Sequence, residues 1–380
     1  MNKLRKTTAT LLIAIFMISA FAVAIPVMSM EPCDSYEAAI IKAADRLIVT
    51  QNLDGGWDWP GPEIPNDPAE GPPSPVNTVG VTAQGILDAY KLTSDPEYLP
   101  ALELAKGALK TLSDLVTLDP LSPLKTRIRG PDITFLVEIE EFTPITTNPD
   151  LAKEYYDKTV TRFDSVAGLI SAVQAHRGID TPLLAWDLNL YVQGALALER
   201  YYPGEYTGDA AIFAEAIYTN CIPLPTPPAS SYVIGVSGAL AAFITTGIHE
   251  DAVDELELLL LEAQDENGYY VDYYEDLPTN PGTFIEYISV QTTAYATMAL
   301  LKTDNLVESI AAGDYFVANQ LGDGSWISSS GGENSEVNSE VAQALYDILC
   351  MRKLNFVPGK GKGLDKIIPN DNFAKGRRKE

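Results

Sequence analysis

Apolar positions along the chain follow two helical patterns that alternate. One pattern is almost wholly apolar and carries small residues at its centre, whereas the other has one apolar and one charged face. Small residues in an apolar helix permit close approach of neighbours on both sides, so the first pattern predicts buried inner helices and the second predicts amphipathic outer helices. The segments of the inner type are 81–87, 191–196, 235–240, 291–296 and 340–345.

An internal repeat organises these helices. Residues 44–57 and 313–326 match nearly position for position, and 261–269 is a weaker copy. In each copy a helix ends at a Gln, and a turn containing Gly and then an aromatic residue follow. The repeat predicts that each outer helix ends in the same kind of turn.

Counting helix pairs gives six units of a length typical of two-helix repeats. Open solenoids and closed rings share this signature, and six pairs is a number that closes a ring. We therefore predict an all-α fold, an (α/α)6 toroid with six inner and six outer helices, in a single domain over 34–351. The expected units are 36–92, 96–143, 150–202, 207–247, 251–303 and 306–350.

The turn motif resembles the QW motif of the terpenoid cyclase and protein prenyltransferase superfamily. A hydrophobic residue, three further residues, Gln, a short turn and Gly-x-Trp occur twice, ending at Trp57 and at Trp326. In that superfamily the motif is a structural brace, so the resemblance implies the toroid fold and a bracing role for Gln51, Trp57, Gln320 and Trp326. It is not specific for an activity.

The chemistry of that superfamily lacks support here. No D-x-D-D acid motif of the squalene-type cyclases occurs, and His176 and His249 have no Cys at zinc-ligand spacing. Residues 44–60 are also similar to the Gly-Gly-Trp-Pro segment of a toroidal pectate lyase family, although Asp58 and Trp59 interrupt it. A pectate substrate would require calcium to bridge acidic partners. We expect no other cofactor, and the sequence identifies no metal ligands.

Loops that lead into the inner helices all rim one mouth of such a ring, and they are rich in aromatic and acidic residues. Aromatic rings stack on sugar faces and carboxylates accept hydrogen bonds from hydroxyls. Asp187 and Glu286 are the candidate acid and base, because each is expected to precede an inner helix beside an aromatic residue. Asp187, Asn189 and Asn338 could equally be helix caps. The candidate substrate-binding residues are Trp59, Trp186, Asn189, Tyr273, Tyr274 and Glu336.

The two ends of the chain and its charge bear on location and partners. Residues 1–24 read as a secretory signal, with a positive start, an apolar run and an Ala-x-Ala cleavage site. No later stretch is long and apolar enough for a membrane span. The formal net charge of −26 disfavours nucleic acid. We expect a secreted or extracytoplasmic protein whose basic tail, 352–380, is disordered.

Three cysteines complete the sequence-based picture. Cys33 precedes the first outer helix and Cys350 ends the last inner helix, so a closed ring would bring them together in a disulfide and leave Cys221 free.

The resulting hypothesis is an exported toroid that binds a polysaccharide or a cell-surface component at the acidic aromatic mouth, with cleavage left open. If it is an enzyme, a polysaccharide lyase or glycoside hydrolase is favoured over a cyclase or prenyltransferase. The alternatives are a non-catalytic secreted scaffold or adhesion module, and a divergent terpenoid cyclase-like protein without the acid motif.

Overall fold

The computed structural model describes residues 33–58, 79–118, 130–145, 149–177, 181–224, 231–275, 284–329 and 331–355. The chain divides into two units, 1–35 and 36–380, and the account below concerns the second. The predicted signal segment, the Pro-rich stretch after Trp59 and most of the basic tail lie outside the described residues. The last helix continues to Asn355, so the start of the segment assigned to the tail is helical.

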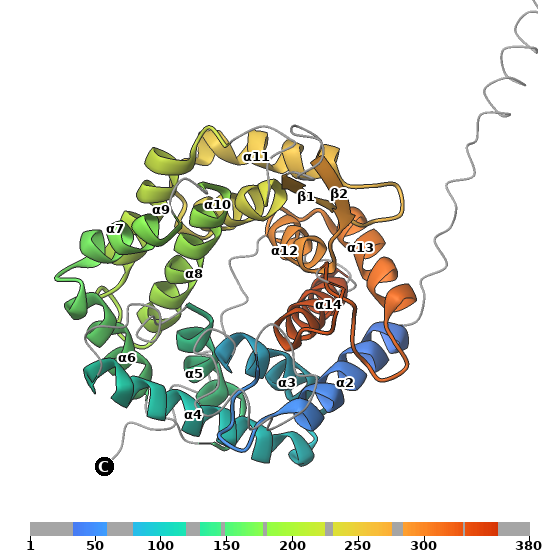
Figure 1. Cartoon of the computed structure of the whole chain (residues 1–380), viewed down its shortest axis with the longest axis horizontal. Coiled ribbons are helices and arrows are strands. Elements are labelled where there is room, and N and C mark those ends of the chain that lie inside the picture. Colours follow the sequence, from blue (N-terminus) through green and yellow to red (C-terminus); the bar gives the residue numbers. More distant parts are fainter. Residues whose placement is uncertain are drawn as a thin grey trace, which may run out of the picture. The chain divides into compact units, whose positions relative to one another are not determined.

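Six helices form the inner ring predicted from the apolar segments. Each packs against its predecessor, and the last packs against the first, so the ring closes (Figure 1). The inner helices are α3 (Val79–Thr93), α5 (Gly130–Phe142), α8 (Thr181–Glu199), α10 (Tyr232–Thr246), α12 (Val290–Leu301) and α14 (Ser335–Asn355).

Outer helices surround this ring and connect one inner helix to the next (Figure 1). The third repeat has two of them, because the chain turns at Asp164, whose φ is 65°, and starts a second helix. The outer helices are α2 (Cys33–Thr50), α4 (Leu99–Leu118), α6 (Pro149–Arg162), α7 (Val166–Arg177), α9 (Thr207–Cys221), α11 (Glu250–Ala263) and α13 (Leu306–Asn319). A short 3-10 helix, Pro96–Tyr98, precedes α4. The all-α toroid prediction is confirmed.

The segment between α11 and α12 is not the loop that the sequence suggested. Strands β1 (Val271–Glu275) and β2 (Phe284–Ile288) form an antiparallel hairpin there, in which Tyr273 faces Glu286 across the pair. Most residues of both strands are aromatic or β-branched, and such residues favour extended backbone.

The repeated Gln side chains join consecutive repeats. The Nε2 atom of Gln51 donates to the carbonyl oxygen of Gly55 in its own turn, at 3.0 Å, and to that of Ala101 on α4, at 2.9 Å. Gln264 bonds in the same way to Gly268 and Glu308, and Gln320 to Gly324 and Ala39. Each Gln therefore closes its own turn and ties it to the next outer helix, and Gln320 ties the last repeat to the first.

Glycine is required in these turns for two reasons. Gly324 has a φ of 94°, and a Cβ atom there would lie 2.2 Å from the carbonyl oxygen of Lys42 on α2.

The aromatic side chain that follows, Trp326, is fully buried and donates its indole N–H to the carbonyl oxygen of Phe316 at 2.8 Å. Trp57 does the same to Leu47. The turns thus pack tightly on the neighbouring repeat.

A serine joins the last inner helix, α14, to the first, α3, through hydrogen bonds. The Oγ atom of Ser339 donates to the carbonyl oxygen of Val81 at 2.6 Å and accepts the N–H of Gly85 at 2.9 Å. Gln343 adds a second bond to Val81 at 3.1 Å. Both helices approach closely because Gly85 has no side chain, and a Cβ atom there would lie 2.6 Å from the serine oxygen.

Of the three cysteines, Cys221 is a buried free thiol, and burial raises its pKa to about 12. The predicted bridge between Cys33 and Cys350 stays a prediction, because the side chain of Cys33 lies outside the described part. Cys350 interacts with Tyr346 on its own helix.

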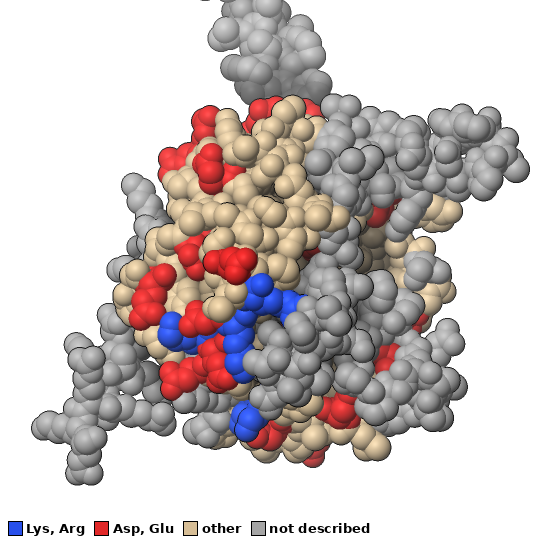
Figure 2. Space-filling model, turned by 60° about the vertical axis from the view of Figure 1, so that its left-hand side comes forward, with Lys and Arg blue, Asp and Glu red and all other residues tan. Residues whose placement is uncertain are grey.

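Acidic side chains are scattered over the face shown in Figure 2, whereas the basic ones gather in one area.

Candidate functional site

The inner helices expose one face toward the inside of the ring, which we call the interior wall. Along α8 the partly exposed residues recur every three or four positions, and they share one helix face. On α5 the partly exposed residues recur at a similar spacing, and on α12 and α14 they recur after seven residues, or two turns, which also keeps them on one helix face. The interior wall comprises Leu183, Trp186, Leu190, Gln193 and Leu196 of α8, Thr134, Glu138 and Glu141 of α5, Gln291, Met298 and Lys302 at α12, and Glu336, Gln343 and Asp347 of α14.

Two aromatic rings meet on this wall near the N-terminal ends of the inner helices. Trp186 of α8 stacks on Tyr295 of α12, with ring centroids 3.7 Å apart and an angle of 29° between the planes. Helix α10 lies between α8 and α12 in the ring (Figure 1), so the two side chains meet in front of it. Gly238 of α10 permits this, because a Cβ atom there would lie 2.7 Å from the Cα atom of Trp186.

Tyr295 connects this stack to a buried carboxyl group. Its hydroxyl donates to Oε1 of Glu340 on α14, and the Nε2 atom of Gln291 donates to Oε2 of Glu340 at 2.9 Å. Glu340 is only 3% exposed. Burial, and then the charge of Glu336 one helical turn earlier, hold the pKa of Glu340 well above its usual range. Burial therefore favours the neutral form of this carboxyl group, against the hydrogen bonds from Tyr295 and Gln291, which favour the charged form.

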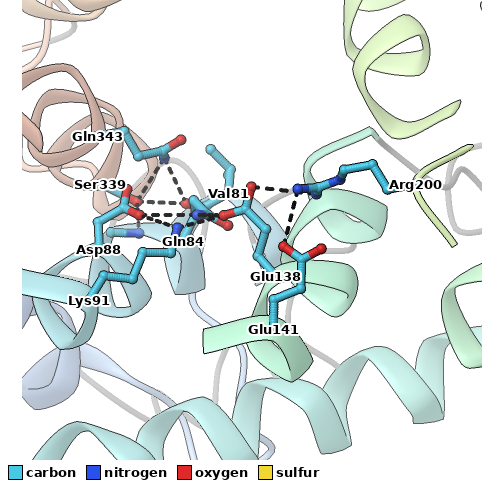
Figure 3. Close-up of polar contacts among 10 residues, drawn as sticks. Val81, Gln84, Asp88, Lys91, Glu138, Glu141, Arg200, Ser339 and Gln343 are labelled. Atoms are coloured by element: carbon cyan, nitrogen blue, oxygen red, sulfur yellow. Dashed lines mark hydrogen bonds and ion pairs between the residues drawn. The ribbon is translucent and has the colours of Figure 1, made fainter. Parts of the chain in front are cut away.

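A second polar network lies toward the C-terminal ends of the inner helices (Figure 3). Lys91 of α3 forms ion pairs with Asp88 at 2.8 Å and with Glu138 of α5 at 2.6 Å. Gln84 also donates to both carboxylates, and Arg200 pairs with Glu141 at 3.1 Å. Burial raises the pKa of Asp88 to about 7 against the opposing charge of Lys91. Two cations, Lys91 and Arg200, thus pair with three carboxylates, and the network joins α3, α5 and the residue that follows α8.

The structure places several predicted site residues differently from the sequence-based expectation. Trp186, Asp187 and Asn189 lie inside α8, not in a mouth loop, because that helix begins at Thr181. The apolar pattern of Leu184, Ala185 and Leu188 continues the helix through them. Asp187 and Asn189 are therefore not caps.

The predicted cap at Asn338 is also wrong. This residue lies within α14, and its Oδ1 atom accepts the backbone N–H of Trp326 at 2.8 Å. Asn334 is the residue that binds the start of the helix, through the N–H of Glu336. Glu336 itself lies in the first turn of α14 and is partly exposed.

Of the remaining predicted residues, Tyr273, Tyr274 and Glu286 belong to the hairpin. Glu286 is an exposed residue of β2, whereas Asp187 is buried in α8. Tyr273 and Tyr274 belong to β1, but their side chains, like the whole of Trp59, lie outside the described part of the chain. The pairing of Asp187 and Glu286 as acid and base stays a prediction.

Sequence reasoning missed Tyr295, Gln291 and Glu340. The signal was present, since Gln291 and Tyr295 lie four residues apart on one predicted inner helix, and Glu336 and Glu340 lie four apart at the start of another. No group of His, Cys, Asp and Glu side chains able to hold a metal ion occurs among the residues described. Within the same residues, no helix is both long and apolar enough to cross a membrane.

Comparison with known proteins agrees with the toroid architecture. No protein-family model matches the chain, and no curated protein matches it in sequence. A glycosidase variant solved in complex with glucose is similar over 84% of this chain and 98% of its own, with 9% identity and a TM-score of 0.51. The type II terpene cyclase MstE from Scytonema is similar over 84% of this chain and 99% of its own, with 11% identity and a TM-score of 0.47. The chain is an α/α toroid, and the likeness to the glycosidase bears on its fold alone.

Proposed function

We propose that this toroid is exported, binds a neutral saccharide chain on the interior wall beside Trp186, and hydrolyses a glycosidic bond there. The observation that carries the proposal is the assembly of Trp186, Tyr295 and Glu340. It combines an aromatic plate for a sugar face with a buried carboxyl group whose pKa is raised by its burial. The glycosidase solved with glucose is a toroid of this kind that accommodates a sugar.

Glu340 is the proposed general acid. Its proton would pass to the glycosidic oxygen as the bond to the anomeric carbon breaks, and Glu336 would attack that carbon as a carboxylate. Residues four apart on a helix have Cβ atoms about 5–6 Å apart. Their side chains can therefore bring the two carboxyl groups to the separation of about 5–5.5 Å that retaining enzymes have. Water would then release the sugar from Glu336, with Glu340 accepting a proton from the water.

The charge of the site favours a neutral substrate. Between Tyr201 and Met351 the only Lys or Arg is Lys302, and it follows the C-terminal end of α12. Glu336 and Glu340 lie at the opposite end of the inner ring from Lys302, so a uronic acid bound beside them would meet two acidic side chains and not this cation. An acidic polysaccharide would bind here only with calcium between the two partners.

The test uses an array of neutral and uronic-acid oligosaccharides, followed by calorimetry and reducing-end assays on the tightest ligand. Glu340→Gln is expected to retain binding and to lose turnover by about 10²-fold or more, since it removes the acid. Trp186→Ala is expected to weaken binding.

The matched control is Glu255→Gln, the same chemical change at an exposed site on α11. Asp187→Asn and Glu286→Gln test the sequence-based acid and base in parallel. Full activity of Glu340→Gln, or wild-type protein that binds no oligosaccharide on the array, would contradict the proposal. Binding by wild type without any turnover would leave a non-catalytic module. Mass spectrometry of the secreted chain is expected to find a start near Ile25.

A further inference from the structure

Asn189 is a fully buried amide without hydrogen-bond partners. The side chain has no solvent exposure, and neither Oδ1 nor Nδ2 makes a hydrogen bond. An unsatisfied buried amide lowers stability, because it gives up its hydrogen bonds to water and gains none in the protein. A Leu of similar size would have no polar group to leave unpaired, so Asn at this position lowers the stability of the protein. A buried polar group of this kind commonly has a ligand or a water molecule as its partner.

The place of Asn189 on α8 connects it to the proposed sugar site. It follows Trp186 by three residues and precedes Gln193 by four, so the three side chains lie on one side of the helix. Trp186 and Gln193 are both partly exposed on the interior wall. The small-residue face of α10 packs here, with Gly238 against the backbone of Trp186. Rotation of the Asn189 side chain away from this seam would bring the amide to the wall.

Resting on the function proposed above, we infer that Asn189 binds a pair of adjacent hydroxyl groups of the sugar that stacks on Trp186, and so determines which sugars bind. An amide offers an acceptor and two donors in one plane, and adjacent hydroxyls offer a donor and an acceptor at matching spacing. Ligand binding thereby satisfies a polar group that the unliganded protein leaves unpaired. A sugar lacking one of the two hydroxyls leaves the amide half satisfied and binds more weakly.

The experiment compares Asn189→Leu with Thr159→Val, using the tightest neutral oligosaccharide from the array. Thr159 is also buried with an unpartnered hydroxyl, but it lies on outer helix α6. Both variants are expected to unfold at a higher denaturant concentration than wild type, since each removes an unsatisfied polar group. Only Asn189→Leu is expected to weaken binding, by about 10- to 100-fold. Asn189→Ala, which avoids a larger side chain, is expected to weaken it similarly.

The outcomes separate this inference from the function on which it rests. If wild type binds and Asn189→Leu and Asn189→Ala bind equally well, the amide does not contact the sugar and the inference is wrong while the sugar site stands. Lower stability of Asn189→Leu together with unchanged binding by Asn189→Ala would also overturn it. If wild type binds no oligosaccharide on the array, both the function and the role of Asn189 fall.

Discussion

The hydroxyl group of Ser339 joins the last inner helix to the first. Removing this hydroxyl should lower the free energy of unfolding by more than removing that of an ordinary buried serine. In Ser339→Ala the carbonyl oxygen of Val81 and the N–H of Gly85 each lose a bond between helices, at 2.6 Å and 2.9 Å. At about 1 kcal/mol for each hydrogen bond, the free energy of unfolding should fall by ~2 kcal/mol.

Ser237→Ala is the matched control. Ser237 is equally buried on inner helix α10, but its hydroxyl bonds only to Val233 of the same helix, at 2.7 Å. Its loss should cost ~0.5–1 kcal/mol.

Urea unfolding followed by circular dichroism measures the difference between these two variants. With an m-value of ~3 kcal/mol/M, the midpoint of Ser339→Ala should fall by ~0.7 M, and that of Ser237→Ala by ~0.2–0.3 M. Equal shifts in the two variants would show that the contact between α14 and α3 contributes nothing beyond a local bond. The argument for closure through Ser339 would then be refuted.

Three further predictions concern the braces, the C-terminal network and the buried thiol. Gln320→Ala and Gln264→Ala should each lower the free energy of unfolding by ~1–2 kcal/mol, measured as urea midpoints, because each loses two bonds to backbone carbonyls; a loss at one position only would contradict their equivalence. The folded pKa of Asp88 is about 7, above the ordinary value of 3.8, so its stabilising contribution is complete below about pH 4 and is lost as pH rises through 7. In Asp88→Asn the free energy of unfolding should therefore depend less on pH between pH 4 and 8. The same pH dependence in variant and wild type would count against the raised pKa. Cys221 should react with a thiol reagent at pH 8 only after unfolding, as judged against Cys221→Ser; rapid labelling of the native protein would contradict its burial.

Much of the fold could be predicted because several positions of the repeat accept only one kind of residue. A Gln brace, a Gly with positive φ and an aromatic residue against the preceding helix form a recognisable pattern at each of three turns. The alternation of apolar and amphipathic helices follows from burial on both sides or on one side. These features depend on neighbours in the same or the next repeat, so they can be predicted from the sequence.

The candidate site was less predictable because it depends on contacts between distant helices. Trp186 and Asp187 were assigned to a loop because polar and aromatic residues resemble a loop composition, whereas tertiary packing continues α8 through them. The stack of Trp186 on Tyr295 joins helices that are separated by α10. Glu340 shows why acidic residues in apolar inner helices are more informative than those in loops, since burial alters the chemistry of the carboxyl group.

The central claim is that a neutral sugar binds on the interior wall beside Trp186 and Glu340. A crystal structure of Glu340→Gln soaked with the tightest neutral oligosaccharide tests it most directly. The account predicts a sugar ring stacked on Trp186, with a glycosidic oxygen within hydrogen-bonding distance of residue 340. Density for the oligosaccharide against Glu286 on the exposed hairpin, with none beside Trp186, would contradict it.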